Sequence, residues 1–302
     1  MTAMLEAAAS RGASVATGRG RSPAAAAWRR LVASPAARAG LVIAVAFALI
    51  ALVTPFVHVY DARTDADLTL RLKPPMAGHP FGTDSLGRDI LVRVLHATRV
   101  SLGLAVSAVA VATLIGSVLG FVAGHFRRQV DLVVMFCMDI VLAFPATLLA
   151  IAIVAMIGPG LRNSLFAISL VSIPAYARLS RGAVLALREQ EFVLAAQGLG
   201  CSGRRVLLSH IVPNSLPPLI VQTTLSVAFA ILEAAALGFL GLGAQPPTPE
   251  WGAMLADSYQ YFTSGAWWVF CFPGAAIMLL VLGFNLLGDG LRDALDPRLG
   301  RG

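Results

Sequence analysis

The uncharged stretch VSLGLAVSAVAVATLIGSVLGFVAG, residues 100–124, indicates that this chain folds in a membrane rather than in water. It is longer than the roughly 20 apolar residues that an α-helix needs to cross a bilayer. The whole chain of 302 residues is 57% hydrophobic and 13% charged, with a mean hydropathy of +0.78, whereas a soluble domain carries about 25% charged residues. These values exclude a cytosolic enzyme, a disordered protein and a secreted disulfide scaffold. We therefore expect an all-α integral membrane protein.

Outward from this stretch, five more runs have the composition of membrane spans. They are Leu41–Val59, Leu132–Leu161, Asn163–Ala177, Leu216–Gly243 and Ser258–Gly288. The run Asn163–Ala177 is short and must borrow residues from its flanks. The sequence thus predicts six transmembrane helices, and Pro145, Pro174 and Pro273 are expected to kink three of them.

The arginines indicate the orientation of these spans. They cluster in the N-terminal tail, in the loops after the second and fourth spans, and at the C-terminus. The positive-inside rule therefore predicts that both termini are cytoplasmic. Because the arginines lie in short clusters between apolar runs, the net charge of +7 does not indicate nucleic-acid binding. Four tryptophans fall near predicted span ends, as an interfacial belt requires: Trp28, Trp251, Trp267 and Trp268.

Four regions follow from this division of the chain. We expect residues 1–37 to be a disordered cytoplasmic tail that leads into a retained first span rather than a cleaved signal peptide. Residues 38–99 hold the first span and a long outer loop. Residues 100–290 form a core of five spans with an inner loop at 181–213, and residues 291–302 form a cytoplasmic tail.

The end of the outer loop has the pattern of an amphipathic helix beginning near Thr83. Its apolar face is Leu86, Ile90, Leu91, Val94 and Leu95. On its polar face Asp89 and Arg93 have the i, i+4 spacing of an ion pair. The helix either lies on the membrane surface or packs against the outer loops, and the pattern favours neither.

Gly116, Gly120 and Gly124 recur at every fourth position of the second predicted span. Small residues in this register let two helices approach closely in lipid. The three glycines are expected to pack against another span of this chain or against a partner subunit.

The inner loop contains LREQEFVLAAQGLGCSGRRVLLSHIVPN, residues 187–214. Its first part, Leu187–Gln197, consists of good helix formers and predicts a helix, and glycines then break the chain. Ser202 can cap a second short helix that Pro213 stops. A helix–turn–helix between two spans can pass a push from a partner protein to the membrane-embedded part, whereas an ordinary solvated loop is the simpler interpretation.

This loop resembles the EAA loop of binding-protein-dependent ABC importer permeases. Ala195, Ala196, Gly200 and Pro213 stand in the register of that motif. The glutamate of the motif is replaced by Leu194, with Glu191 three residues earlier. His210 stands where an isoleucine is usual, with Ile211 next to it.

Two further regions resemble the C-type permeases of dipeptide, oligopeptide and nickel importers. They are HPFGTDSLGRDILVRVLHATRVSL from His79, and AALGFLGLGAQPPTPEWGAMLADS from Ala235 together with FNLLGDGLRDALDPR from Phe284. The resemblance extends over nearly the whole chain after the N-terminal tail and is closest to dipeptide permease C-subunits.

The resemblance implies a type I ABC importer (MetI-like) permease fold in a bacterial inner membrane. It implies a complex with a B-type permease, two ATP-binding subunits and an extracytoplasmic substrate-binding protein. Its substrate would be a dipeptide or short peptide, with nickel or glutathione as alternatives. The loop residues expected to couple to an ATPase are Glu191, Ala195, Ala196, Gly200, Arg204, Arg205 and Pro213.

The chain itself has no P-loop, no metal-ligand spacing and no catalytic array, so we expect no cofactor, metal or enzymatic activity. Cys137, Cys201 and Cys271 are interpreted as packing or surface residues. Alternatives from other classes are an ion-driven secondary transporter, which would show inverted repeats, and a membrane-embedded enzyme.

Two acids stand inside predicted spans, Asp139 and Glu233. A charge at the bilayer centre costs at least about 2.5 kcal/mol, so each should face protein or a water-filled cavity. They either line the translocation pathway, facing the amino group of a peptide, or make interhelical hydrogen bonds. Asn285 is a third candidate for the pathway.

Overall fold

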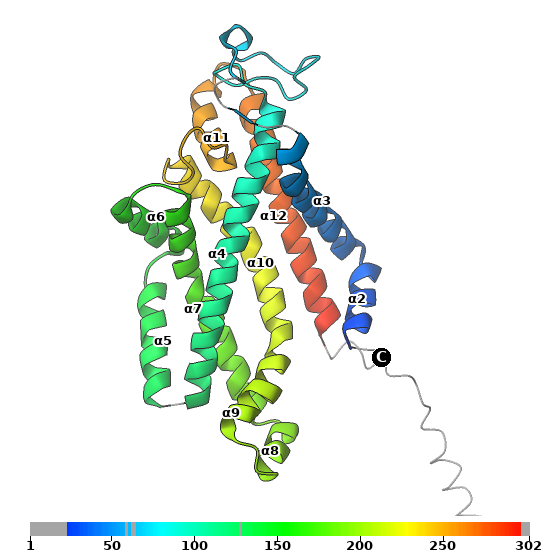
Figure 1. The fold of residues 1–302 in the computed structure, drawn as a ribbon, viewed down its shortest axis with the longest axis vertical. Helices are drawn as coiled ribbons and strands as arrows, with labels where there is room; N and C mark the ends of the chain where they lie inside the picture. Colours follow the sequence, from blue (N-terminus) through cyan, green and yellow to red (C-terminus); the bar gives the residue numbers. More distant parts are fainter. Residues whose placement is uncertain (1–22, 58–59, 62–64, 127, 297–302) are drawn as a thin grey trace, which may run out of the picture.

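The computed structural model describes residues 23–57, 60–61, 65–126 and 128–296, and the regular elements within them are helices (Figure 1). The α-helices are α2 Pro23–Ala33, α3 Pro35–Val57, α4 Ile90–Phe126, α5 Gln129–Leu142, α6 Ala146–Ile157, α7 Leu161–Arg188, α8 Glu191–Gly198, α9 Gly203–Val206, α10 Val212–Phe239, α11 Trp251–Ser258 and α12 Trp268–Leu295. Short 3₁₀ turns lie at Leu68–Leu70 and Tyr259–Tyr261, and a π-helical turn, η2, at Leu207–Ile211.

Within the described residues, four helical stretches are long and apolar enough to cross a membrane. They are α3, α4, the continuous stretch Gly203–Phe239 that contains α10, and α12. The pair α5–α6 brings the number to five if it forms one span. The predicted fourth span lies within α7, which has 28 residues but is more polar than these helices. The all-helical membrane fold is confirmed, whereas the number six is not.

The predicted third span is not one helix. Its two halves, α5 and α6, are bent by 87° with respect to each other. Pro145 precedes α6 as its N-cap, and proline cannot continue a helix without losing a hydrogen bond and clashing with the preceding turn. The halves have 14 and 12 residues, or about 21 and 18 Å at 1.5 Å per residue. Each is therefore shorter than the roughly 30 Å hydrocarbon core.

The helix expected to begin near Thr83 instead begins at Ile90 and continues without a break to Phe126. Asp89 caps it, since its carboxylate accepts from the backbone N–H of Val92 at 3.1 Å. Thr83 and Asp89 face each other across an isolated β-bridge, so the chain between them is a turn. The amphipathic pattern belongs to the first turns of α4, and no separate surface helix exists in this part of the described chain.

The expected pair of Asp89 and Arg93 does not form. Arg93 lies 2.5 Å from the carboxylate of Asp84 and 3.6 Å from that of Asp257. Asp89 lies 2.8 Å from His79. Spacing within one helix missed these partners because the folded outer loop brings Asp84 and His79 back against the start of α4.

The core is formed mainly by α4, α7, α10 and α12, with contributions from α6 and α11, and α4 packs along α7 (Figure 1). Two of the predicted interfacial tryptophans lie inside it, because Trp251 is fully buried and Trp268 is 8% exposed. The indole N–H of Trp251 donates to the Val94 carbonyl at 3.1 Å, and that of Trp268 to the Thr83 carbonyl at 3.1 Å. The belt interpretation is thus wrong for these two residues.

The three glycines of α4 face α7 of the same chain. A Cβ atom on Gly116 would lie 2.6 Å from the Ile173 carbonyl oxygen, and one on Gly120 would lie 2.3 Å from that of Ala177. A Cβ atom on Gly124 would lie 2.7 Å from the Val184 side chain. The sequence left two packing partners open, another span of this chain or a partner subunit. In the structure the glycines pack against another helix of this chain, α7.

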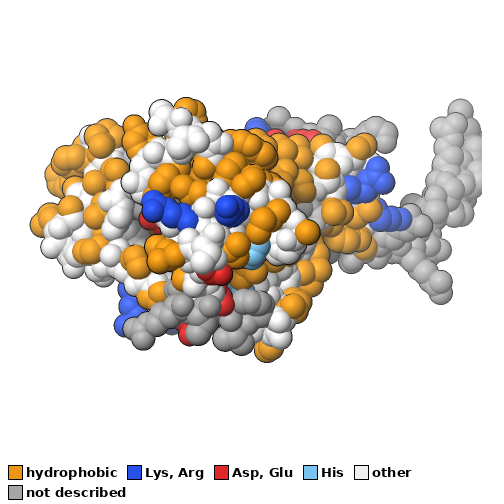
Figure 2. Space-filling model, turned by 90° about the horizontal axis from the view of Figure 1, so that it is seen from above, with side chains coloured by type: hydrophobic (Ala, Val, Ile, Leu, Met, Phe, Trp, Pro, Cys, Tyr) orange, Lys and Arg blue, Asp and Glu red, His pale blue; other side chains and the backbone are white. Residues whose placement is uncertain are grey.

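The molecule is elongated, with α8 and α9 at one end and the loop around residues 65–89 at the other (Figure 1). Seen from the loop end, charged side chains gather amid largely hydrophobic surroundings (Figure 2).

Both predicted tails are partly helical. Residues 23–33 form α2, and its Leu31 packs with Ala37 and Ala294. The helix α12 continues to Leu295, beyond the expected end of the core at residue 290. Most of the tail expected to be disordered, residues 1–22, lies outside the described residues.

Candidate functional site

The inner loop folds into a compact projection, residues 189–206, which we call the elbow. The predicted helix over 187–197 is divided, because α7 ends at Arg188 and α8 begins at Glu191. Gly200 reverses the chain with φ +85°, a conformation that favours glycine. Ser202 then caps α9, where its hydroxyl accepts from the backbone N–H of Arg205. The turn and the cap match the sequence prediction.

A small apolar cluster fixes the elbow to the membrane helices. Val193 and Ala196 of α8 are buried together with Val184 of α7, Val206 of α9 and Ile211 of η2. Side chains from four elements meet here, so the elbow cannot swing freely about its two connections. This packing connects α8 to α7 and to the helix that follows.

The outer face of the elbow combines apolar and charged side chains. Ala195 is exposed, and so are the larger side chains of Phe192, Leu194 and Leu199, the last at 87%. Around them, Glu191, Arg204 and Arg205 are all exposed. Apolar surface rimmed by charges is typical of a site of protein contact.

Pro213 does not stop the second helix of the loop. The stretch Gly203–Phe239 is one continuous helix that includes Pro213 near the start of α10. The π-helical turn Leu207–Ile211 directly precedes it, and there the Val212 N–H bonds to the Leu207 carbonyl. A widened turn of this kind accommodates a proline, which would otherwise clash with the carbonyl four residues earlier. The elbow is therefore joined directly to α10.

A pocket of about 320 Å³ lies between α6, α7 and α10, and its lining combines apolar residues with four polar ones. Its α10 side presents Gln222, Ser226, Phe229 and Glu233, all on one helical face. Ser172 is the polar contribution of α7. We call this the α10 pocket.

Glu233 lies at one end of this pocket and is only 7% exposed. One carboxylate oxygen, Oε1, accepts from the Thr147 hydroxyl at 2.7 Å. The other, Oε2, is buried and has no hydrogen-bond partner among the described residues. Thr147 stands in the first turn of α6, where a carboxylate is also stabilised by the helix dipole.

The other two pathway candidates lie elsewhere. Asp139 of α5 forms an interhelical ion pair with Arg178 of α7 at 2.6 Å, and both side chains are more than half exposed. Asn285 is exposed on α12. Neither lines the α10 pocket, so the structure brings only Glu233 of the three to this site.

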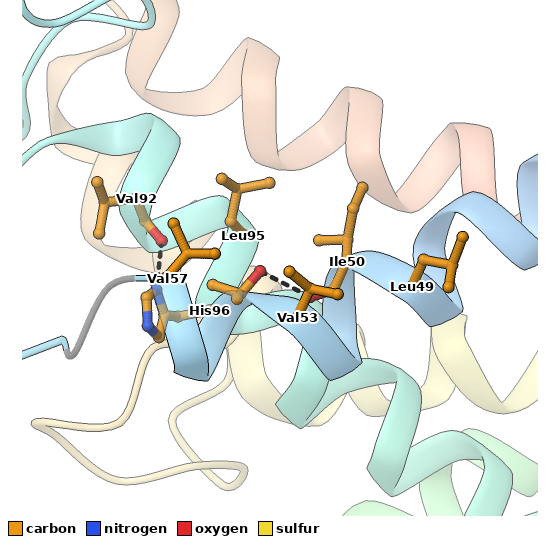
Figure 3. Close-up of a pocket in the computed structure, with 8 residues that line it drawn as sticks. Leu49, Ile50, Val53, Val57, Val92, Leu95 and His96 are labelled. Atoms are coloured by element: carbon orange, nitrogen blue, oxygen red, sulfur yellow. Dashed lines mark hydrogen bonds between the residues drawn. The ribbon is translucent and has the colours of Figure 1, made fainter.

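A second pocket, of about 390 Å³, lies between α3 and the start of α4 (Figure 3). Its lining is aliphatic except for Thr54 and His96. The Thr54 hydroxyl donates to the Ile50 carbonyl at 2.6 Å, and the His96 ring lies 3.0 Å from the Val92 carbonyl (Figure 3). Because both polar groups are bonded within their own helices, this pocket offers a polar solute little.

Family models assign two parts of the chain. Residues 116–301 match the model described as "binding-protein-dependent transport system inner membrane component". Residues 22–75 match the N-terminal transmembrane domain of oligopeptide transport permease C.

The chain belongs to the inner membrane components of binding-protein-dependent transport systems.

Proteins of similar sequence support this assignment over about nine-tenths of the chain. It is 50% identical to the dipeptide transport system permease protein DppC of Alkalihalophilus pseudofirmus, covering 90% of this chain and 89% of the relative. It is 46% identical to the di/tripeptide transport system permease protein DppC of Pseudomonas aeruginosa, covering 90% and 91%. The glutathione transport system permease protein GsiD of Pectobacterium atrosepticum is 42% identical and is covered to 90%.

A chain of the MetNI methionine ABC transporter, solved in an inward-facing conformation, has the same fold. Its TM-score against this chain is 0.57 at 18% identity, and the match covers 68% of this chain and 98% of that one. At this identity the likeness concerns the fold alone. The type I importer (MetI-like) fold expected from the sequence is confirmed.

Two features of this chain were not predicted from its sequence. Gln222 and Ser226 of the pocket stand at positions i and i+4 in a largely apolar span and lie on the same face as Glu233. That spacing was the available signal. The pair of Asp131 with Arg181, at 2.5 and 2.7 Å, was not foreseen because it joins residues 50 positions apart.

Proposed function

We propose that this chain is a permease subunit of an ATP-driven importer of dipeptides or other short peptides. The observation that carries the proposal is the 50% identity, over nine-tenths of the chain, to a dipeptide transport system permease protein. The name of a second relative, at 46% identity, includes both di- and tripeptides. Glutathione is a second candidate because a glutathione permease protein is 42% identical.

The elbow would be the contact to an ATP-binding subunit. Its exposed apolar residues and charged rim support this role, because they form a surface that a partner could bury. Its attachment through Val193 and Ala196 supports transmission of force. In this arrangement a second, B-type permease completes the transmembrane part, two ATP-binding subunits hydrolyse ATP, and a substrate-binding protein delivers solute from outside.

Both termini and the elbow would face the cytoplasm. The arginine clusters support this orientation through the positive-inside rule. The position of α8 and α9 at the end opposite the 65–89 loop fits the same assignment (Figure 1).

The α10 pocket would lie on the route of the substrate. Its support is the combination of polar side chains and a buried carboxylate in an otherwise apolar part of the molecule. The pathway proposal is thereby restricted to Glu233, since Asp139 and Asn285 lie outside the pocket.

Uptake by the complete complex tests the proposed function. Vesicles containing both permeases and both ATP-binding subunits, supplied with the binding protein, would be given labelled dipeptide, nickel or glutathione. We expect ATP-dependent accumulation of the dipeptide. Accumulation of nickel or glutathione alone would contradict the peptide assignment, and uptake without ATP-binding subunits would contradict an ATP-driven importer.

A variant of the elbow tests its coupling role in the same vesicles. Ala195→Trp places a bulky side chain on the exposed face of α8, and we expect it to abolish dipeptide uptake while membrane insertion is retained. Ala33→Trp, at an exposed alanine of α2, is the matched control and should transport normally. Normal uptake by the Ala195 variant would count against docking at the elbow.

A further inference from the structure

The α10 pocket contains a buried acceptor that the described residues do not satisfy. Glu233 Oε1 is bonded to Thr147, whereas Oε2 lacks a partner among the described residues. A buried carboxylate oxygen left unpaired is costly, more so than a neutral group. A group from outside this chain is therefore expected to approach Oε2.

The remaining polar groups of the pocket are already engaged. The Gln222 amide donates to the Ser226 hydroxyl at 3.2 Å, and the Ser172 hydroxyl donates to the Ile168 carbonyl at 2.8 Å. The pocket reaches the surface of the chain past Ala175 and Phe229, both of which are exposed. A ligand entering there would meet neutral walls and the side chain of Glu233, whose unsatisfied oxygen Oε2 is covered and must turn towards the ligand to bond to it.

The charge of the lining selects the class of ligand. No lysine or arginine lines the pocket, and its one charged side chain is that of Glu233, so an anion would not be favoured. The described residues contain no cluster of three or more potential metal ligands, and a single carboxylate is too few for a divalent metal. A monovalent donor such as an ammonium group fits, because it can bond to the free oxygen and to the hydroxyls nearby.

We propose that the α10 pocket binds a primary ammonium group through Glu233 Oε2. This inference rests on the proposed function, in which a peptide supplies that group from its amino terminus or from a lysine side chain. A charge-assisted hydrogen bond in a buried site distinguishes a peptide with this group from one without it by roughly tenfold to a hundredfold in affinity.

A purely structural role makes a different prediction. Through Thr147, the Glu233 carboxylate also holds the first turn of α6. If that contact were its whole role, Thr147→Val and Glu233→Gln would have the same effect on every ligand. If Oε2 binds ammonium, Thr147→Val keeps the preference for the charged ligand, and Glu233→Gln loses it.

The test measures binding to the purified transporter complex in lipid nanodiscs without the binding protein, so that delivery does not influence the result. The ligands are alanyl-alanine, acetyl-alanyl-alanine and acetyl-alanyl-lysine. We expect the wild type to bind alanyl-alanine at least about tenfold more tightly than its acetylated form. Glu233→Gln should bind both equally. Asp139→Asn, which removes an exposed carboxylate outside the pocket, is the matched control and should keep the preference.

The lysine ligand distinguishes the two sources of ammonium. If acetyl-alanyl-lysine binds as tightly as alanyl-alanine, the site accepts a side-chain amine as well as the peptide amino terminus. If it binds as weakly as acetyl-alanyl-alanine, the site accepts the peptide amino terminus alone. A preference retained in Glu233→Gln would overturn the proposal. So would loss of complex assembly in that variant alone, since Oε2 would then pair with a partner subunit.

Uptake measured in parallel separates this proposal from the proposed function. If the wild-type complex with its binding protein imports alanyl-alanine with ATP but shows no preference for the free amine in nanodiscs, only the ammonium site is wrong. If it imports no peptide, the proposed function is wrong.

Discussion

Gly198 and Gly200 stand two residues apart in the elbow but have different backbone requirements. Gly198 ends α8, whereas Gly200 has φ +85°. A Cβ atom at either position would meet no atom within 4 Å. Any difference between alanine substitutions at the two sites therefore reports backbone conformation alone.

We expect Gly200→Ala to destabilise the elbow by about 1–2 kcal/mol, the cost of left-handed backbone for a residue with a Cβ atom. Gly198→Ala should be neutral or stabilising by up to about 1 kcal/mol, because alanine has the higher helix propensity. Hydrogen exchange of α8 and α9 measures the difference. Equal protection in the two variants would contradict a turn that depends on Gly200.

Glu250 is a second residue whose environment makes a testable prediction, and it lies outside the spans, at the N-cap of α11. Burial raises its pKa above the ordinary value of 4.5, while bonds from the Gly252 and Ala253 N–H groups and the Ser101 hydroxyl partly oppose the shift. The folded protein therefore holds this proton more tightly than the unfolded chain does. The resulting stabilisation is complete below pH 4.5 and is lost as the pH rises through the raised pKa.

Glu250→Gln should remove this pH dependence, because a glutamine does not titrate. The unfolding temperature of the wild type, relative to that of the variant, should rise as the pH is lowered from about 7 towards 4.5. Thermal unfolding in detergent over this range measures it. A difference that is constant with pH would show that ionisation of Glu250 does not contribute.

At the scale of elements, the contact between α4 and α7 depends on the absence of side chains at three positions. Gly120 is the tightest of them, since its Cβ atom would lie 2.3 Å from the Ala177 carbonyl oxygen. Gly103 of the same helix has open space around it. The two glycines provide a matched pair for testing close helix packing.

We expect Gly120→Ala to destabilise the protein by about 1–3 kcal/mol, because backbone atoms must move to admit the methyl group. Gly103→Ala should be neutral or slightly stabilising. Comparison of thermal unfolding midpoints tests the pair. A Gly120 variant as stable as the Gly103 variant would mean that α4 and α7 are not in close contact.

The elements could be predicted from the sequence where the signal was local. Apolar runs predicted α3, α4, α10 and α12, and the Gly200 turn and Ser202 cap followed from residue type. Features that depend on tertiary contacts were missed. The ion pair between Arg93 and Asp84 requires the folded outer loop, and the path of the chain through Pro213 requires a π-helical turn that spacing does not reveal.

At the scale of the whole molecule, the elbow and the outer loop lie at opposite ends (Figure 1). Leu199 is 87% exposed at the elbow, and Met76 is 38% exposed in the loop. If the molecule crosses the membrane along its length, the two positions lie on opposite sides. The lining of the α10 pocket could be predicted only in part, because Glu233 stands out as an acid within a span, whereas the residues of α6 and α7 that face it depend on tertiary packing.

Single cysteines at the two positions test this orientation in a background where Cys137, Cys201 and Cys271 are replaced by serine. A membrane-impermeant maleimide should label Met76→Cys in intact cells, and Leu199→Cys only in inverted vesicles. The reverse pattern would contradict a cytoplasmic elbow. Labelling of both from one side would contradict the lengthwise crossing.

The unbroken helix Gly203–Phe239 has 37 residues, about 55 Å at 1.5 Å per residue. It begins in the elbow and passes Glu233 near its far end. A rod of this length acts as a lever, in which a small tilt at one end becomes a larger displacement at the other. The widened turn at Leu207–Ile211 is the natural place for it to bend. Movement of the elbow would then reach Glu233 through a helix whose flexibility depends on this turn, and in the proposed importer stiffening the turn would alter the ATP consumed for each solute carried.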